Sequence, residues 1–223
     1  MQYDGSKNGS GVYQTIINLI PPHKIYIEPF LGSGAVMRFK LPAEVNIGIE
    51  KDEAVIRKFW SRPIAPYIIL KDDAISWLSY NPVAPGTFIY LDPPYPISSR
   101  RSGNKIYRKE LTDNDHRELL QIIRGLKCNV LISTYENPIY KEYLKDWHLV
   151  KYKAVTQKGT ATEFLYMNYS PPEVLHDYSF VGSNFTQRQR IKRKISRHIE
   201  RLERLPAHER NAILTAILKN NPL

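Results

Sequence analysis

Short apolar runs alternate with helical patterns along most of this chain, and this alternation predicts a doubly wound, mostly parallel, Rossmann-like α/β sheet. Two other observations complete the expected fold class. Alternating residues on both sides of Lys158-Gly159 predict an antiparallel hairpin that closes one edge of the sheet. Beyond residue 183, isoleucines recur at helical spacing with basic residues between them, which predicts a C-terminal helical appendage.

The expected elements follow in order from the N-terminus. A helix over 12–20 ends at two prolines, and a strand over 25–27 leads through a glycine-containing turn into a helix over 35–39. Further strands are expected over 46–50, 67–70, 87–91, 129–134, 148–155 and 163–169. Further helices are expected from Asp52 to Trp60, over 74–78, from a Thr112/Asp115 capping box to Arg124, after Pro138, and on both sides of Pro206.

The length of 223 residues suits one domain, expected over 1–175, with a basic helical extension over 176–223. No apolar run approaches the roughly 18 residues of a membrane span, and no signal-peptide core is visible, so we expect a cytoplasmic protein without a membrane partner. The single Cys128 excludes an intramolecular disulfide, and six scattered histidines predict no metal site. We expect a monomer or a weak homodimer.

The net charge of +10 favours a polyanionic partner, above all nucleic acid, although a basic surface can also serve solubility alone. The charge is concentrated between Arg188 and Arg204, a stretch with eight basic residues and only two acidic ones, Glu200 and Glu203. A second basic stretch is expected to be a loop over 96–111. The candidate nucleic-acid-binding residues are Arg100, Arg101, Lys105, Arg108, Lys158, Arg190, Arg193, Lys194 and Arg197.

Gly32-Ser33-Gly34 stands where the first strand turns into a helix, so a ligand can approach the backbone and the free helix N–H groups. A dinucleotide-binding turn would have a third glycine or alanine where Met37 stands, which favours a smaller nucleoside-bearing cofactor. The preceding Pro29-Phe30 pair forms an apolar wall that suits a sulfonium compound better than a phosphate.

Two acidic residues at strand ends are candidate cofactor ligands. Glu50 ends the second strand and is placed to accept hydrogen bonds from two ribose hydroxyls. Asp73 follows the third strand and is placed to bind an adenine amino group. Helix capping is the alternative role for Asp73 and Glu50, as it is for Asp52.

Asp92-Pro93-Pro94-Tyr95 follows an apolar strand, and this combination suits a flat ring that carries an exocyclic amine. The Asp92 carboxylate and the Pro93 carbonyl can accept the two N–H groups of the amine and localise its lone pair. The prolines stiffen the loop and the Tyr95 ring offers a stacking face. An ordinary strand-ending turn is the alternative interpretation.

The segment Glu28-Pro29-Phe30-Leu31-Gly32-Ser33-Gly34, followed by Asp92-Pro93-Pro94-Tyr95, resembles the adenine-N6 DNA methyltransferases of the Dam type. Short phage and prophage adenine methylases are the most similar members. The resemblance covers roughly residues 1–170, and includes an N-terminal Tyr-x-Gly-x-Lys element (Tyr3, Gly5 and Lys7) and a late strand that ends in Asn168-Tyr169.

This resemblance implies S-adenosylmethionine as the cofactor. It implies catalytic roles for Asp92, Pro93, Pro94 and Tyr95 on a flipped-out adenine. The implied cofactor-binding residues are Tyr3, Lys7, Glu28, Pro29, Phe30, Gly32, Ser33, Gly34, Glu50, Asp73 and Asp92. Members of the family carry a target-recognition segment between the glycine and Asp-Pro-Pro-Tyr motifs. Here the core elements fill that interval, so recognition falls to the 96–111 loop, the 156–162 turn or the C-terminal helices.

Three alternatives remain open from the sequence. The same chemistry can act on an RNA adenine. A nucleic-acid-binding protein can retain a methyltransferase scaffold without activity. The Arg188–Arg204 helix can pack on the main domain or dock to a protein through its isoleucines.

Overall fold

The computed structural model describes residues 7, 9, 11–60, 67–99, 110–156 and 159–220, without the side chains of 60, 155 and 156. The chain divides into two compact units, Met1–Ser179 and Phe180–Leu223. Each unit is described by itself.

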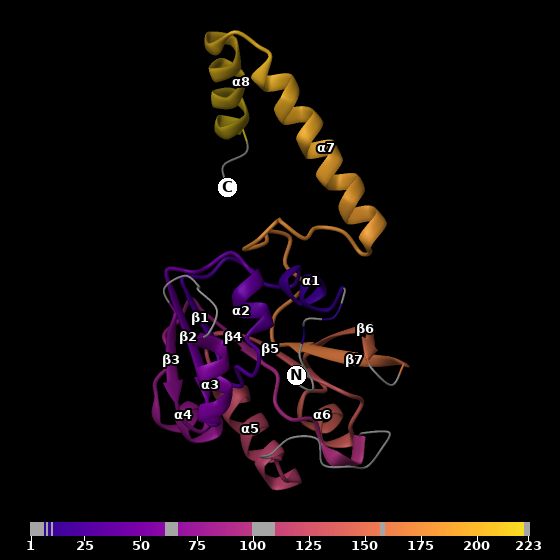
Figure 1. Cartoon of the computed structure of the whole chain (residues 1–223). Coiled ribbons are helices and arrows are strands. Elements are labelled where there is room, and N and C mark those ends of the chain that lie inside the picture. The colour runs from indigo at the N-terminus through magenta and orange to yellow at the C-terminus, as the bar shows by residue number, and fades with distance from the viewer. Residues whose placement is uncertain are drawn as a thin grey trace. The chain divides into compact units, whose positions relative to one another are not determined.

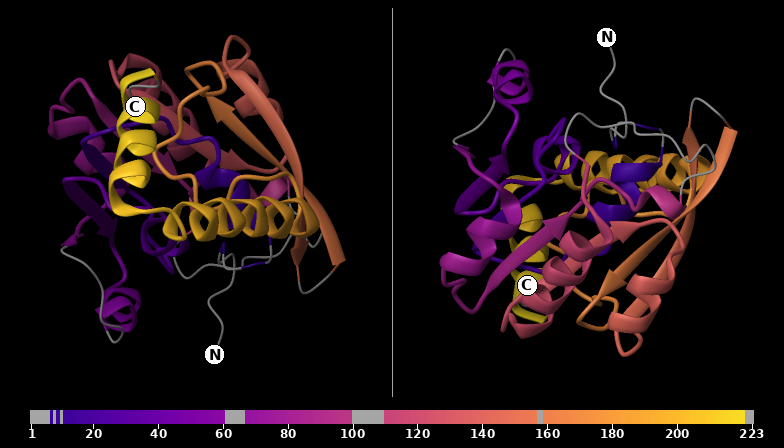
Figure 2. Two further views of the ribbon diagram at one scale, coloured as in Figure 1. Left: turned by 90° about the horizontal axis from the view of Figure 1, so that it is seen from above. Right: turned by 90° about the horizontal axis from the view of Figure 1, so that it is seen from below.

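The first unit is built on a seven-stranded sheet with the order β3-β2-β1-β4-β5-β7-β6 (Figure 1). Its strands are β1 (Ile25–Glu28), β2 (Val45–Glu50), β3 (Ile68–Lys71), β4 (Thr87–Leu91), β5 (Asn129–Thr134), β6 (His148–Thr156) and β7 (Gly159–Met167). The first five strands pair parallel with one another, whereas β7 pairs antiparallel with both β5 and β6. The predicted doubly wound, mostly parallel sheet with an antiparallel hairpin at one edge is confirmed, and Figure 2 shows that hairpin from two sides.

The helices of the first unit begin close to their expected positions. They are α1 (Val12–Ile17), α2 (Ala35–Phe39), α3 (Glu53–Trp60), α4 (Ala74–Tyr80), the 3-10 turn η1 (Ile97–Ser99), α5 (Asp113–Gly125) and α6 (Pro138–Tyr143). The expected capping box is present, because Thr112 and Asp115 each accept the backbone N–H of the other. Helix α1 is shorter than expected, because the amides of Leu19 and Ile20 turn back to the carbonyls three residues earlier.

The core occupies both faces of the sheet, as the alternation of side chains along a strand requires. On one face, strand residues such as Ile27, Ile89 and Ile132 pack with buried residues of α4, α5 and α6. On the other face, the fully buried rings of Tyr26 and Phe88 stack at 6.2 Å. Cys128 lies in the core, as expected, and burial raises the pKa of its thiol to about 11.

The order of the sheet reverses between β1 and β4, which lie side by side. In an open α/β sheet, ligands bind outside the carboxyl ends of the strands at such a reversal. The glycine turn follows β1 and Asp92 follows β4, so both motifs stand at this one place in the fold. The fold alone therefore indicates where a site should be sought.

The second unit holds two helices, α7 (Phe185–Glu203) and α8 (Ala207–Asn220). The Asn184 side chain caps α7 by accepting the Gln187 N–H at 2.9 Å. The helices carry exposed apolar side chains, among them Ile195, Ile199 and Leu218. The unit holds ten Lys and Arg and three Glu, and hence seven of the chain's ten net positive charges. The predicted C-terminal helical appendage is confirmed.

Candidate active site

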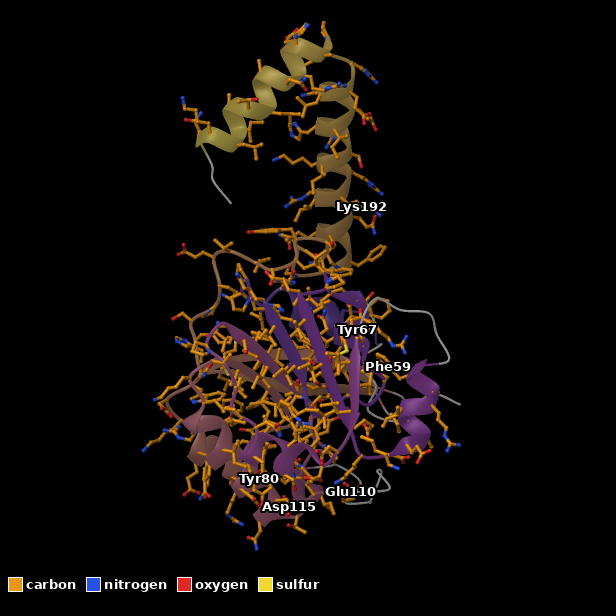
Figure 3. The ribbon with its side chains drawn as sticks, turned by 90° about the vertical axis from the view of Figure 1, so that its left-hand side faces the viewer. Phe59, Tyr67, Tyr80, Glu110, Asp115 and Lys192 are labelled. Carbon is orange, nitrogen blue, oxygen red and sulfur yellow. The ribbon has the colours of Figure 1, made fainter. Side chains whose placement is uncertain are left out.

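The glycine turn after β1 depends on its glycines. Gly32 and Gly34 have φ values of 49° and 60°, in the left-handed region that favours glycine. A Cβ atom on Gly34 would lie 2.4 Å from a ring carbon of Phe59, which packs edge-on against Tyr67 (Figure 3). The turn therefore has neither conformational nor spatial room for a side chain at position 34.

Two acidic residues hold this turn. Glu28 is buried, and its Oε2 atom accepts both the Tyr26 hydroxyl at 2.8 Å and the Met37 amide at 3.1 Å. Burial raises the pKa of Glu28 to about 8. Glu50 accepts the Gly32 amide at 3.0 Å through Oε2 and the Asp52 amide at 2.9 Å through Oε1. Each carboxylate oxygen has further acceptor capacity, so Glu50 can still receive ribose hydroxyls.

Asp73 performs the capping role that the sequence left open for it. Its Oδ1 atom accepts the amides of Ile75 and Ser76 at the start of α4, and its Oδ2 atom lies 3.3 Å from Lys51 Nζ. The neighbouring wall of the turn is formed by Pro29, which is buried, and Phe30, which is half-buried against the core. These residues stand around the carboxyl ends of β1, β2 and β3, as a cofactor site at the sheet reversal requires.

Asp92 follows β4, whose five residues are all buried, and its side chain is 18% exposed. Its Oδ1 atom lies 3.0 Å from the Nζ atom of Lys7, which is 7% exposed. Burial raises the pKa of Asp92 to about 6, although the Lys7 ammonium lowers it in part. The N-terminal segment and the loop after β4, widely separated in sequence, thus meet in one ion pair.

The Tyr95 ring is buried next to this pair. Lys7 donates a hydrogen bond to the Tyr95 hydroxyl, and its Nζ atom lies 4.8 Å from the centroid of the ring. The ring also packs edge-on against Tyr135 at 4.6 Å. Pro93 is buried and Pro94 is half-buried. The ammonium of Lys7 thus contacts both the carboxylate and the aromatic ring that the sequence assigned to a target amine.

Sequence analysis missed two members of this cluster, Glu163 on β7 and Tyr152 opposite it on β6. The Oε2 atom of Glu163 accepts hydrogen bonds from Lys7 Nζ at 2.9 Å, from the Tyr95 hydroxyl at 3.1 Å and from the Tyr152 hydroxyl. A charged residue at the start of the apolar run of β7 was the only signal in the sequence. Which residue faces it depends on the hairpin register, which the sequence did not specify.

The cluster combines two carboxylates and one ammonium in a nearly buried place. The carboxylates raise the pKa of Lys7 well above its ordinary value, despite the opposing effect of burial. The Lys7 ammonium and the Tyr152 hydroxyl lower the pKa of Glu163, against the effect of its burial. Lys7 and Glu163 are therefore both charged at neutral pH, and Asp92 is the member of the cluster that titrates near it.

Several predicted residues lie outside this cluster. Tyr3, Arg100, Arg101, Lys105, Arg108 and Lys158 lie outside the described residues. Ser33 is half-buried, and its carbonyl accepts Arg38 Nε at 3.2 Å. Asn168 bonds to the backbone at Val130 and Cys128, at the opposite end of β5 from the cluster, and so has a structural role.

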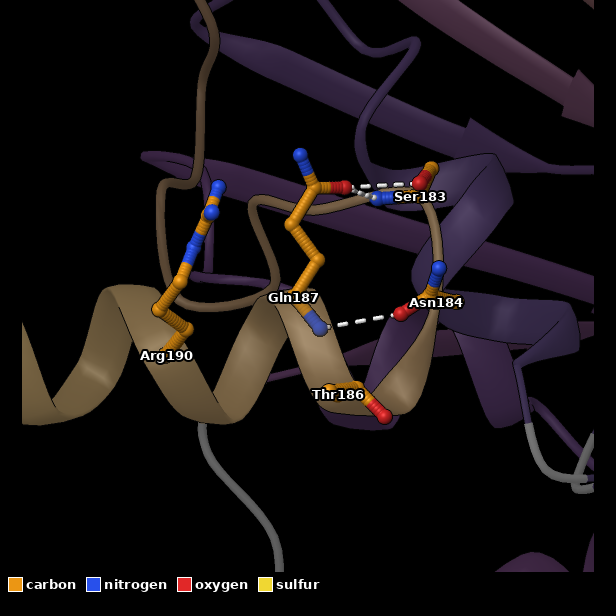
Figure 4. A pocket seen from close by; sticks show the side chains of 5 residues that line it. All are labelled: Ser183, Asn184, Thr186, Gln187 and Arg190. Carbon is orange, nitrogen blue, oxygen red and sulfur yellow. Dashed lines mark hydrogen bonds between the residues drawn. The ribbon is translucent and has the colours of Figure 1, made fainter.

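Arg190, Arg193, Lys194 and Arg197 are exposed on α7. The start of this helix forms a shallow pocket of about 350 Å³, lined by Ser183, Asn184, Thr186, Gln187 and Arg190 (Figure 4). Hydrogen bonds within the turn use two of the side-chain oxygens there, since Gln187 Oε1 accepts from Ser183 and Asn184 Oδ1 accepts the Gln187 amide. Within the described ranges, no three His, Cys, Asp or Glu side chains gather as a metal site requires. Among the described helices, none combines the length and apolar character needed to cross a membrane.

No protein-family model matches the sequence, and no curated protein matches it either. Solved structures with a similar fold include a Streptococcus mutans protein in complex with SAH (11% identity, TM-score 0.48, covering 69% of this chain and 94% of that one). An rRNA methylase from Streptococcus thermophilus has 13% identity and a TM-score of 0.46, with coverage of 70% and 92%. A precorrin 8w decarboxylase from Methanobacterium thermoautotrophicum has 14% identity and a TM-score of 0.44, with coverage of 75% and 98%.

Proposed function

We propose that this chain transfers a methyl group from S-adenosylmethionine to the N6 amine of an adenine that is flipped out of DNA. The observation that carries this proposal is the meeting of two motifs at the reversal of the sheet. The turn around Gly32 and Gly34 ends β1, and the Asp92-Pro93-Pro94-Tyr95 loop ends the adjacent β4. A cofactor at the first motif and a flat amine at the second would then be neighbours.

The glycine turn suits a nucleoside-bearing cofactor. Its backbone is open to close approach, and Glu50 beside it retains acceptor capacity for ribose hydroxyls. Pro29 and Phe30 supply an apolar wall, and the nearly buried carboxylate of Asp92 favours a cationic centre nearby. When bound, the sulfonium cofactor would supply an activated methyl group: its S–CH3 bond would break as the N–CH3 bond forms, and it would leave as the neutral thioether. The nitrogen then loses one proton, which the Asp92 carboxylate is placed to accept.

The acceptor side needs to orient the amine and to raise its reactivity. The Asp92 carboxylate and the Pro93 carbonyl accept its two N–H groups, while the Tyr95 ring offers a face for the base. Alignment of the nitrogen with the methyl group can supply much of the rate, because effective molarities for well-oriented reactants are large. The base must first leave the duplex stack, which costs a few kcal/mol.

Basic residues of the second unit offer a means to offset that cost. Arg190, Arg193, Lys194 and Arg197 recur at intervals of three or four residues and so share one side of α7. Phosphate contacts by such a stripe bind nucleic acid without reading its sequence. We assign this side of α7 to the nucleic-acid backbone, together with Arg100, Arg101, Lys105, Arg108 and Lys158 of the sequence.

The experiment that tests the proposal is transfer of labelled methyl from S-adenosylmethionine to unmethylated duplex DNA and to RNA, followed by nucleoside analysis. The expected result is label in N6-methyldeoxyadenosine. Label only in N6-methyladenosine of RNA would keep the chemistry and change the polymer. Label in neither polymer, with S-adenosylmethionine bound in calorimetry, would overturn the proposal in favour of a nucleic-acid-binding role.

The matched variants are Asp92→Ala and Asp113→Ala. Asp92→Ala removes the acceptor of the amine, so transfer should be lost while cofactor binding is largely retained. Asp113 is exposed in the first turn of α5, and its replacement should change neither property. Equal activity of Asp92→Ala and the unchanged protein would exclude the assigned role of this loop.

A further inference from the structure

We propose that Glu163, with Tyr152 behind it, is a positioning residue of the acceptor site that holds Lys7 and sets the ionisation of Asp92. The expected effects on activity rest on the proposed function, whereas the expected effect on the Asp92 titration does not. The inference is drawn from one ammonium shared by two carboxylates: Lys7 Nζ lies 3.0 Å from Asp92 and 2.9 Å from Glu163.

Lys7 occupies the place that the target amine needs. It donates to the Asp92 carboxylate and lies over the Tyr95 ring, the two groups assigned to the base. An adenine that enters must therefore replace Lys7 in both contacts. A buried ammonium without a carboxylate partner is strongly unfavourable, so Lys7 needs a second carboxylate that stays paired with it.

Glu163 meets this requirement. Its side chain is 7% exposed, and one of its oxygens accepts Lys7, Tyr95 and Tyr152 together. Because β6 and β7 form a continuous antiparallel pair in which Tyr152 faces Glu163, the hairpin fixes the position of the carboxylate. Lys7 can therefore give up Asp92 to the target amine and stay paired with Glu163.

The same arrangement affects the charge of Asp92. A like charge close by disfavours ionisation, so Glu163 raises the pKa of Asp92 while Lys7 lowers it. The other carboxyl group that interacts with Asp92 is that of Glu28 on β1, and its pKa of about 8 keeps it protonated where Asp92 titrates. The phenols that interact with Asp92 also keep their protons in this range, and they belong to Tyr26, Tyr90, Tyr95, Tyr140 and Tyr152. Glu163 is thus the ionised carboxylate whose removal changes Asp92 most directly.

Glu163→Gln tests this proposal because it retains an oxygen acceptor for all three donors and removes only the charge. Among the described residues, Asp92 is then the one anionic partner left to Lys7, which competes with the target amine. We expect kcat/KM for the nucleic acid to fall about tenfold, with a rise in its KM, as expected for one charge-assisted hydrogen bond. The acid limb of the pH–rate profile should move to lower pH by about one unit, and the KM for S-adenosylmethionine should stay unchanged.

Two further variants separate charge from structure. Tyr152→Phe keeps the Glu163 charge and should leave the acid limb in place with a smaller loss of activity. Glu142→Gln removes an exposed carboxylate of α6 and should change nothing. An acid limb that stays fixed in Glu163→Gln, or a uniform loss of activity without a change in KM, would reduce Glu163 to a structural contact and overturn the proposal.

A readout without activity keeps this test apart from the test of function. In protein labelled with carbon-13 at the aspartate carboxyls, the Asp92 signal is identified by its absence in Asp92→Asn. NMR then measures the pH at the midpoint of the Asp92 titration. A lower midpoint in Glu163→Gln supports the inference even if no polymer accepts methyl. An unchanged midpoint overturns it, even if adenine methylation is observed.

Discussion

Lys7 Nζ lies 3.0 Å from Asp92 Oδ1 in a nearly buried ion pair that joins the N-terminal segment to the end of β4. The pair occupies the sheet reversal where the proposed acceptor would bind. Its properties lead to the first of four predictions.

Activity should depend on the ionisation of Asp92. Burial raises its pKa to about 6, so the carboxylate gains its proton as the pH falls below that value and can no longer accept both an amine proton and Lys7. We expect kcat/KM to fall about tenfold per pH unit below pH 6 and to be flat from pH 7 to 8. The pH–rate profile measures this, and a flat profile down to pH 5 would contradict it.

Gly34→Ala should destabilise the first unit. The φ of 60° strains an alanine, and the new methyl group would lie against the Phe59 ring. We expect a loss of about 2–4 kcal/mol in the free energy of unfolding, measured by urea denaturation, together with weaker cofactor binding. Gly125→Ala is the matched control, because nothing lies within 4 Å of its Cβ position. Equal stability of the two variants would argue against the tight turn.

Glu28→Gln should change the pH dependence of stability. The pKa of Glu28 is about 8 in the folded chain and about 4.5 in the unfolded chain, so folding becomes less favourable as the pH rises between these values. Both hydrogen bonds end on one oxygen, which glutamine retains. We expect the variant to match the unchanged protein near pH 5 and to exceed its stability at pH 8.5. Denaturation at both values measures this, and a variant equally destabilised at both would contradict it.

Replacing Arg193, Lys194 and Arg197 together by glutamine should weaken nucleic-acid binding and reduce the slope of log K against log salt by about three. The comparison is with Lys127, Lys141 and Lys145 replaced together, three exposed lysines of the first unit. Both triple variants lose the same net charge. If their salt slopes match, the basic side of α7 does not contact phosphates, and its role lies in packing or docking.

Alternating patterns and turn residues were sufficient to predict the sheet and most helix starts. Asn129–Thr134 and Ala35–Phe39 have the expected bounds, because buried strands and glycine turns are local features. Helix ends were less well predicted, as in α1, where the last turn tightens before the prolines. The role of Asp73 as a cap was open in the sequence, since a residue after a strand can serve the next helix or a ligand.

Short-range patterns of burial and turn chemistry were enough to predict the order of the elements, and to place the glycine turn and the Asp92 loop at strand ends. The contacts between distant side chains depend on the folded structure. Lys7, Asp92 and Glu163 are separated by most of the main unit, and their contact follows from strand order and hairpin register. The raised pKa of Asp92 likewise depends on the folded structure, because the carboxylate is buried and meets its charged neighbours only after the chain has folded.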